Sequence, residues 1–486
     1  MRHGNLPPRP SSHPILRLRA LGVALLPLVL ALTLPACGVH ECGPAPWLPA
    51  PSLTAADGVV YAQGAGDIAD LRAGAGTIAW RSATDFAPNP SRPAPPVVTD
   101  GFVIVTVGFG ALIAQRLSNG SRAWRSQALP RPWGGDSNFL PIPKVVGNVV
   151  YAAASPDTIA AWRVADGTLL WQSPSLISTT DPTYGSYYSQ VPEPVVAGNV
   201  IYFVAGTDVC AIRATDGSLL WSTPVSAAPG LPNPLRYTPA VFADGRIFIV
   251  VADGSLYALD ADTGAVLWHA PDPDLATIPT SYQNPTYFAP PIVRDGVVYY
   301  APLLRIRALN AATGHLLWRF PMYPCPPSSA PVIAGGIVYV TLQACLTSWR
   351  IQTGGALAAL DAHTGAARWV AGIQPSRLPG TTVLVHGDTV YTISPGEGLP
   401  NYTYASTPGV VAAWSVSKGL LLWQRAIQSP SPVFQQVAFA DGVIYLSTDG
   451  APDSPPGCGG IRILPAVSAL STSDGALLWQ TFAPVA

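Results

Sequence analysis

The chain has 486 residues and a formal net charge of −1, and charged residues make up only 11% of it. Lys144 and Lys418 are its two lysines, so the concentrated basic surface that nucleic-acid binding requires is missing. The small number of basic residues and the net charge near zero exclude nucleic acid as a partner.

The N-terminus predicts export. Arg17 and Arg19 precede an apolar run from Leu21 to Leu34, and Pro35, Ala36 and Cys37 follow it. A basic segment, an apolar segment and small residues before a cleavage point are typical of a secretory signal. This stretch looks like a bacterial lipoprotein signal.

That resemblance implies a signal peptide over residues 1–36, a lipidated tether over 37–49 with diacylglyceryl at Cys37, and a protein anchored to the bacterial membrane or envelope outside the cytoplasm. An uncleaved transmembrane anchor, or an ordinary signal peptide with a coincidental cysteine, is the alternative. All of these predict export.

A strand-like run that ends in tryptophan recurs nine times after residue 50. Repetition at this period indicates a propeller, a solenoid or an array. The terminal tryptophans are Trp80, Trp124, Trp171, Trp221, Trp268, Trp318, Trp369, Trp423 and Trp479.

The fifth unit shows the pattern within each repeat. "TPAVFA" turns at Asp244 and Gly245, a pair that tolerates the positive φ of a tight hairpin, and "RIFIVV" returns as a second strand. "SLYALDA", a turn at Asp262 to Gly264 and "AVLWHA" complete the unit. Four such strands form one propeller blade.

The units "VIYFVAGTDVCAIRATDGSLLW" and "VVYYAPLLRIRALNAATGHLLW" repeat this frame almost unchanged. The frame resembles the pyrroloquinoline-quinone-type (PQQ-like) β-propeller repeat. The resemblance implies an all-β propeller of four-stranded antiparallel blades over residues 50–486. Eight blades are usual in that family, whereas we count nine units, of which the first is the most degenerate.

Six cysteines leave an odd number once Cys37 is set aside. Gly335 and Gly336 turn a hairpin in which Cys325 and Cys345 come nearly opposite each other, so they are a candidate cross-strand disulfide, although a slip of one residue would place them on opposite faces. Cys210 lies in a third strand and is predicted to be a buried free thiol rather than a nucleophile.

Quinoprotein dehydrogenases use the PQQ-like propeller to hold PQQ and calcium. This chain has no adjacent cysteine pair and only three glutamates, Glu41, Glu193 and Glu397, so no ligand of that family can be carried over. Asp260, Asp262 and Gly264 resemble the start of a calcium loop, but no bidentate glutamate follows, and a turn explains them.

Other aspartates, including Asp166, Asp216, Asp361 and Asp441, are expected in analogous turns, where the side chain accepts a local hydrogen bond. The histidines show no spacing typical of a metal site. We therefore expect no catalytic residue, no metal and no cofactor, with PQQ and calcium as the alternative.

The connections between units, and the second-to-third connections of later units, are long and should emerge on one face of the ring. They contain aromatic residues, which supply large contact areas and are our candidate binding site, although they could instead pack the loops against their own blades. These residues are Trp133, Phe139, Tyr184, Tyr187, Tyr188, Tyr282, Tyr287, Tyr402 and Tyr404.

Lys144 and Glu193 each open the innermost strand of a neighbouring unit and are expected to pair with each other. The sequence as a whole predicts a membrane-anchored, noncatalytic scaffold that binds a protein, peptide or glycan through its loop-rich face. A PQQ- and calcium-dependent dehydrogenase of alcohols or sugars is the competing function, and a sensor propeller is a third.

Overall fold

The computed structural model divides the chain into residues 1–43 and a compact unit of residues 44–486. All that follows concerns the second unit. Within the described residues, no helix is long and apolar enough to cross a membrane. The structure describes residues 50–64, 66–84, 94–107, 111–127, 142–155, 158–176, 193–225, 237–272, 289–302, 305–322, 327, 329–342, 346–347, 350–351, 355–373, 381–394, 408–427, 434–448 and 465–482.

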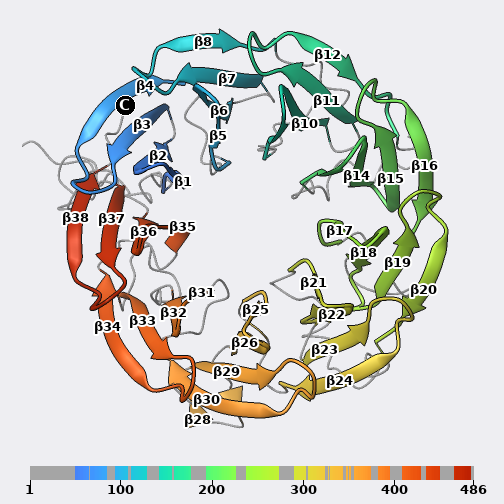
Figure 1. The fold of residues 1–486 in the computed structure, drawn as a ribbon, viewed down its shortest axis with the longest axis vertical. Coiled ribbons are helices and arrows are strands. Elements are labelled where there is room, and N and C mark those ends of the chain that lie inside the picture. Colours follow the sequence, from blue (N-terminus) through green and yellow to red (C-terminus); the bar gives the residue numbers. More distant parts are fainter. Residues whose placement is uncertain are drawn as a thin grey trace, which may run out of the picture. The chain divides into compact units, whose positions relative to one another are not determined.

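Nine four-stranded antiparallel sheets follow one another around a ring, and the chain order of the sheets is their order in space (Figure 1). Blades 1 to 3 comprise β1 (Ser52–Ala56), β2 (Val59–Gln63), β3 (Asp67–Arg72), β4 (Ile78–Ala83), β5 (Val97–Thr99), β6 (Phe102–Val107), β7 (Ala111–Arg116), β8 (Arg122–Arg125), β9 (Lys144–Val146), β10 (Val149–Ser155), β11 (Thr158–Arg163) and β12 (Leu169–Gln172).

Blades 4 to 6 comprise β13 (Val195–Ala197), β14 (Val200–Ala205), β15 (Asp208–Arg213), β16 (Leu219–Pro224), β17 (Val241–Ala243), β18 (Arg246–Val250), β19 (Leu256–Asp260), β20 (Val266–Ala270), β21 (Ile292–Arg294), β22 (Val297–Tyr300), β23 (Arg305–Asn310) and β24 (Leu316–Pro321).

Blades 7 to 9 comprise β25 (Val332–Ala334), β26 (Ile337–Leu342), β29 (Gly355–Asp361), β30 (Ala367–Ile373), β31 (Thr382–His386), β32 (Thr389–Ser394), β33 (Gly409–Ser415), β34 (Leu421–Ile427), β35 (Phe434–Ala440), β36 (Val443–Thr448), β37 (Ala466–Ser471) and β38 (Leu477–Phe482). A separate hairpin, β27 (Leu346–Thr347) and β28 (Arg350–Ile351), lies between β26 and β29 in the chain.

The first hairpin of each blade turns tightly, as predicted. In blade 5, Asp244 and Gly245 have φ values of 49° and 70°. Two consecutive positive φ angles are typical of the type I′ turn, whose twist matches that of the flanking strands. Ala243 therefore pairs with Arg246, and the register of β17 and β18 follows from this turn.

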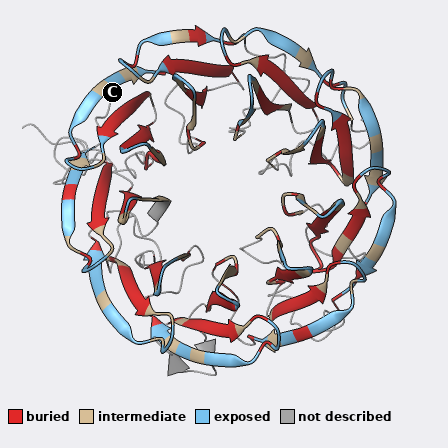
Figure 2. Ribbon diagram, viewed as in Figure 1, coloured by how far each residue is buried: buried red, intermediate tan, exposed pale blue. Residues whose placement is uncertain are grey.

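Burial is layered from the centre of the ring outward. The second and third strands of each blade are almost wholly buried, and the fourth strands form an exposed outer rim (Figure 2). In seven of the nine blades an apolar pair precedes the tryptophan and lies on this rim, as Leu219 and Leu220 do with exposures of 46% and 40%. The repeated tryptophan, by contrast, turns toward the next blade.

Each terminal tryptophan docks on the following blade. Its indole N–H donates to a backbone carbonyl there, and its ring covers a glycine in the turn between the third and fourth strands. Gly217 illustrates the fit, because its φ is +71° and a Cβ would come within 2.5 Å of the Trp171 ring. The nine indole donors and carbonyl acceptors are Trp80 to Leu117, Trp124 to Val164, Trp171 to Ala214, Trp221 to Ala261, Trp268 to Ala311, Trp318 to Ala362, Trp369 to Val416, Trp423 to Thr472 and Trp479 to Ala73.

The last of these bonds closes the ring. Trp479 of blade 9 donates to Ala73 of blade 1 over 2.7 Å, and Thr481 donates to the Gly76 carbonyl. An apolar cluster that includes Val60, Leu71, Tyr445 and Trp479 fills this junction, as comparable clusters fill the other eight. The nine counted units are therefore nine blades, and the degenerate first unit forms a complete one.

Candidate binding face

The two faces of the ring differ in the connections they carry. In an up-and-down sheet, the first-to-second and third-to-fourth turns leave one edge, and the remaining connections leave the other. The short turns occupy the first of these faces, which we call the turn face. The long connections begin and end on the opposite face, the loop face, as predicted: Gln172 ends β12 before Val195 opens β13, and Ser394 ends β32 before Gly409 opens β33.

The aromatic residues predicted to form the binding site lie outside the described residues, so their role stays a prediction. They are Trp133, Phe139, Tyr184, Tyr187, Tyr188, Tyr282, Tyr287, Tyr402 and Tyr404. The same holds for the candidate lipidation site Cys37 and for the candidate disulfide Cys325–Cys345. The strand ends beneath the long connections are described, and three groups of side chains there can be examined.

The first group is a single ion pair. Lys144, the first residue of innermost strand β9, pairs with Glu193, which lies just before β13, and this confirms the predicted pairing. Their side chains are 46% and 30% exposed. An ion pair so accessible to water contributes at most about 1 kcal/mol. It therefore adds little to the stability of the ring.

The second group is a buried ion pair between blades 5 and 6. Asp272 lies just after β20, and Arg305 opens β23; Arg305 Nη1 is 3.2 Å from Asp272 Oδ1. The Asp272 side chain is fully buried and that of Arg305 is 11% exposed. Removing one member of such a pair costs far more than the pair itself contributes, because the other charge stays out of water. The pair thus ties the start of one loop-face connection to the end of another.

Arg307 extends this group inward. Its Nη1 donates to the Tyr300 hydroxyl over 2.7 Å and to the Pro271 carbonyl over 3.1 Å, and its guanidinium carbon is 5.7 Å from the Tyr300 ring centroid. Burial raises the pKa of Tyr300 well above its usual range, and the carboxylate of Asp272 acts in the same direction while Arg307 opposes it. Tyr300 is therefore neutral at physiological pH.

The third group is a stack of Tyr257 on His269, with ring centroids 4.1 Å apart and planes at 17°. These residues face each other across β19 and β20. Burial lowers the pKa of His269, and Asp253 opposes this shift. The imidazole is thus mainly neutral near pH 7, and the stack is an apolar support rather than a charged one.

The predicted turn aspartates and the predicted buried thiol are confirmed, with one correction. Asp260 Oδ1 accepts hydrogen bonds from the N–H groups of Asp262 and Thr263, at 3.2 and 2.9 Å. Asp441 is different, because it lies in the first hairpin turn of its blade, with φ of 51°, where a short polar side chain tolerates the left-handed conformation. Cys210 is free and buried, and burial raises the pKa of its thiol to about 11.

Sequence reasoning did not single out Arg307. It occupies a third-strand position that holds Ala160 in blade 3, Ala358 in blade 7 and Ala412 in blade 8. Superposing the nine third strands column by column would have identified it, since no other blade has a charged residue at this position and a buried arginine needs a partner. Among the described residues, no three His, Cys, Asp or Glu side chains gather closely enough to hold a metal ion.

Comparison with known proteins places the chain in a family. The family model described as outer membrane protein assembly factor BamB matches residues 64–233 and 231–481. Tetrathionate hydrolase of Acidithiobacillus ferrooxidans is 24% identical over 345 residues, which are 63% of this chain and 62% of that protein. BamB of Moranella endobia is 28% identical over 190 residues, which are 39% of this chain and 44% of that protein. The chain thus spans less than two thirds of these curated relatives.

Two solved structures are partly similar to this chain. The crystal structure of BamB from Moraxella catarrhalis has a TM-score of 0.49 at 15% identity and covers 70% of this chain and 92% of its own. Quinohemoprotein alcohol dehydrogenase from Comamonas testosteroni has a TM-score of 0.47 at 16% identity and covers 74% of this chain and 70% of its own.

Proposed function

The chain belongs to the family described as outer membrane protein assembly factor BamB, and we propose that it is an exported, lipid-anchored, noncatalytic scaffold that binds a protein partner through its loop face. The supporting observation is that the ring carries all its long connections on that one face. Conserving a rigid ring while varying the loops on one side is how β scaffolds commonly present a binding surface.

The strand ends beneath the loop face are suited to a scaffold. The buried pair of Asp272 with Arg305, and the bonds of Arg307 to Tyr300 and Pro271, fix the base of two connections between blades 5 and 6. These contacts join side chains and backbone at the base of the two connections, which is a structural role. Strand ends that are already ordered reduce the conformational entropy that is lost when a partner binds.

The chemistry of the partner follows from the predicted surface. Tyrosine and tryptophan provide apolar area with a polar edge, and such residues are enriched where proteins bind proteins. The relatives named as assembly factors point to a protein of the cell envelope rather than to a peptide or a glycan.

Site-specific photo-crosslinking in the producing cell tests this proposal. A photoreactive amino acid at Tyr187 or Tyr404, within the chain segments that join β12 to β13 and β32 to β33, is expected to give a discrete crosslinked protein. The matched control is the same amino acid at Asp244, in an exposed turn on the turn face. Crosslinking from Asp244 alone, or from neither face, would contradict the proposal.

The competing quinoprotein function has its own measurement. Titration of the chain with PQQ and calcium by calorimetry, with dye-linked oxidation of alcohols and sugars followed in the same samples, is expected to show neither saturable binding nor turnover. Turnover that depends on both PQQ and calcium would replace the scaffold with a dehydrogenase.

A further inference from the structure

One blade breaks the repeat at a buried position. In eight blades, the third-strand residue opposite the terminal tryptophan is alanine, whereas in blade 1 it is Asp70, opposite Trp80. The eight alanines are Ala114, Ala161, Ala211, Ala258, Ala308, Ala359, Ala413 and Ala469. Alanine thus satisfies the packing of this position, and the fold does not require a carboxylate there.

The Asp70 side chain also carries an energetic cost at this position, because it is buried. It is 2% exposed, and its Oδ1 is buried without a hydrogen-bond partner. Burial raises the pKa of this carboxyl, while Arg72 and a hydrogen bond with Trp80 oppose the shift. Polar atoms left unsatisfied inside a protein are uncommon and often belong to binding or catalytic sites.

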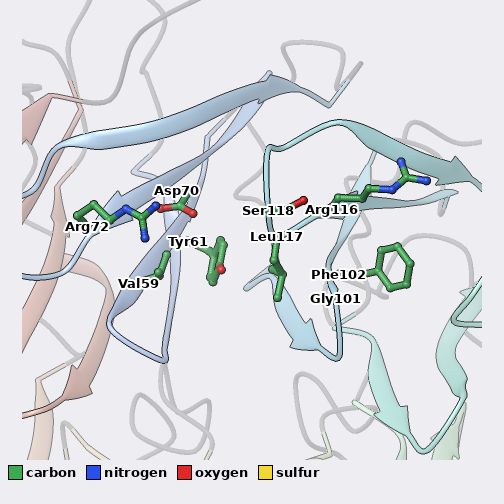
Figure 3. Close-up of a pocket in the computed structure, with 9 residues that line it drawn as sticks. All are labelled: Val59, Tyr61, Asp70, Arg72, Gly101, Phe102, Arg116, Leu117 and Ser118. Atoms are coloured by element: carbon green, nitrogen blue, oxygen red, sulfur yellow. The ribbon is translucent and has the colours of Figure 1, made fainter.

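Asp70 lines a pocket of about 540 Å³ between blades 1 and 2, on the turn face. Tyr61 and Arg72 line it from blade 1, and Leu117 and Ser118 stand on the opposite wall, with Phe102 and Arg116 beyond them (Figure 3). Much of the wall is apolar, through Val59, Phe102 and Leu117. This volume suits a small organic molecule.

The two arginines of the pocket lack the aspartate that their counterparts have three residues later in the chain, and Arg72 lies beside Asp70 instead (Figure 3). Arginine ends the third strand in blades 1 to 4. In blades 3 and 4, it pairs with an aspartate three residues later, as Arg163 does with Asp166 and Arg213 with Asp216.

At the corresponding positions, Arg72 is followed by Ala75 and Arg116 by Asn119. Among the described residues, the hydrogen bonds of the Arg116 side chain are two long ones of 3.4 Å, to the Ser121 hydroxyl and the Arg122 carbonyl. The pocket therefore has guanidinium groups on both of its sides and a carboxyl group on its blade 1 wall.

We propose that this pocket binds a short peptide zwitterion of about dipeptide size. Its ammonium group would donate to Asp70 Oδ1, its carboxylate would lie against Arg116 on the blade 2 side, and an apolar side chain would contact Phe102 and Leu117. Guanidinium groups bind carboxylates with two parallel hydrogen bonds, and an ammonium group supplies the donor that the buried oxygen lacks. The site is independent of the loop face and of the scaffold function.

Calorimetry on the full chain with Ala-Leu and Ala-Phe tests the proposal. Saturable binding is expected, and N-acetyl-Ala-Leu and Ala-Leu amide, each of which lacks one charge, are expected to bind at least ~10-fold more weakly because one charge-assisted hydrogen bond is lost. Equal affinity for the acetylated peptide would reduce the pocket to an anion site and overturn the zwitterion assignment. Absence of saturable binding by both dipeptides would overturn the site.

Protein variants provide the second arm. Asp70→Ala installs the residue that the other eight blades use, so this variant should fold, and it is expected to bind the dipeptides at least ~10-fold more weakly. Arg116→Ala should have a comparable effect. Arg213→Ala changes the equivalent residue of blade 4, outside the pocket, and should bind as the parent does; undiminished binding by Asp70→Ala would refute the role given to the carboxylate.

Discussion

Replacing Asp70 by alanine should make the protein more stable. The structure supplies the magnitude: one buried carboxyl oxygen without a partner costs about 1–3 kcal/mol. The replacement also loses the attraction of Arg72 and the hydrogen bond with Trp80, so part of that gain is offset. Because the position borders an open pocket, removing the side chain leaves no closed cavity. We expect a net gain of about 1 kcal/mol at pH 7.

The effect should depend on pH with a definite sign. Burial raises the pKa of Asp70 in the folded protein above the value of about 3.9 for an unfolded chain. Between these two pKa values the folded protein binds more protons than the unfolded one, so the contribution of Asp70 to stability is greatest below the unfolded pKa and falls as pH rises through the folded pKa. The advantage of Asp70→Ala should therefore be larger at pH 7 than at pH 4.

Urea unfolding at both pH values, followed by tryptophan fluorescence, measures this difference. The alanine variant should unfold at higher urea than the parent, and Asp70→Asn, which cannot ionise, should remove the pH dependence without the full gain. A variant that is less stable than the parent at pH 7, or an advantage equal at pH 4 and pH 7, would refute the reasoning.

Three further outcomes are expected. Gly217→Ala should lower the free energy of unfolding by about 2 kcal/mol or more, because it combines a clash with the docked indole and a positive φ. Gly198→Ala, which has a positive φ but open space around it, should lower it by about 1 kcal/mol, and equal urea midpoints for the two variants would contradict the docking role. Arg305→Ala should lower the free energy of unfolding by about 3 kcal/mol, because it leaves the buried Asp272 carboxylate without its ion-pair partner, whereas Lys144→Ala, in an exposed pair, should lower it by less than about 1 kcal/mol. Thermal unfolding compares the two variants, and a larger loss for Lys144→Ala would be inconsistent with the burial argument. Cys37→Ala should move the protein from the membrane fraction to the soluble fraction, and unchanged fractionation would count against lipid anchoring.

The fold was predictable because its determinants recur. Trp80 and Trp479 mark the first and last of nine units, and turns such as Asp244-Gly245 fix the register locally. The closure of the ring could not be derived in this way, because it depends on Trp479 of the last blade meeting Ala73 of the first, a contact between segments far apart in sequence that no local pattern encodes.

The candidate sites were less predictable, for a different physical reason. Arg307 and Asp70 follow the strand pattern and differ from the other blades only in side-chain chemistry, so the hydrophobic period does not mark them. The pairing of Lys144 with Glu193 was predictable because few other charges compete for either residue. Aligning the nine blades with one another is what distinguishes residues that the packing of the ring requires from residues that are specific to one blade.

The indole-on-glycine contact also makes the packing of the ring independent of the point at which the chain is opened. Each junction presents the same donor, the same kind of acceptor carbonyl and the same bare glycine, and the junction between blades 9 and 1 is no exception. The contacts between blades therefore do not depend on which blade comes first in the chain. A circularly permuted chain, opened at a turn-face hairpin and rejoined between Phe482 and Ser52 by a flexible linker, would rebuild all nine junctions from the same surfaces.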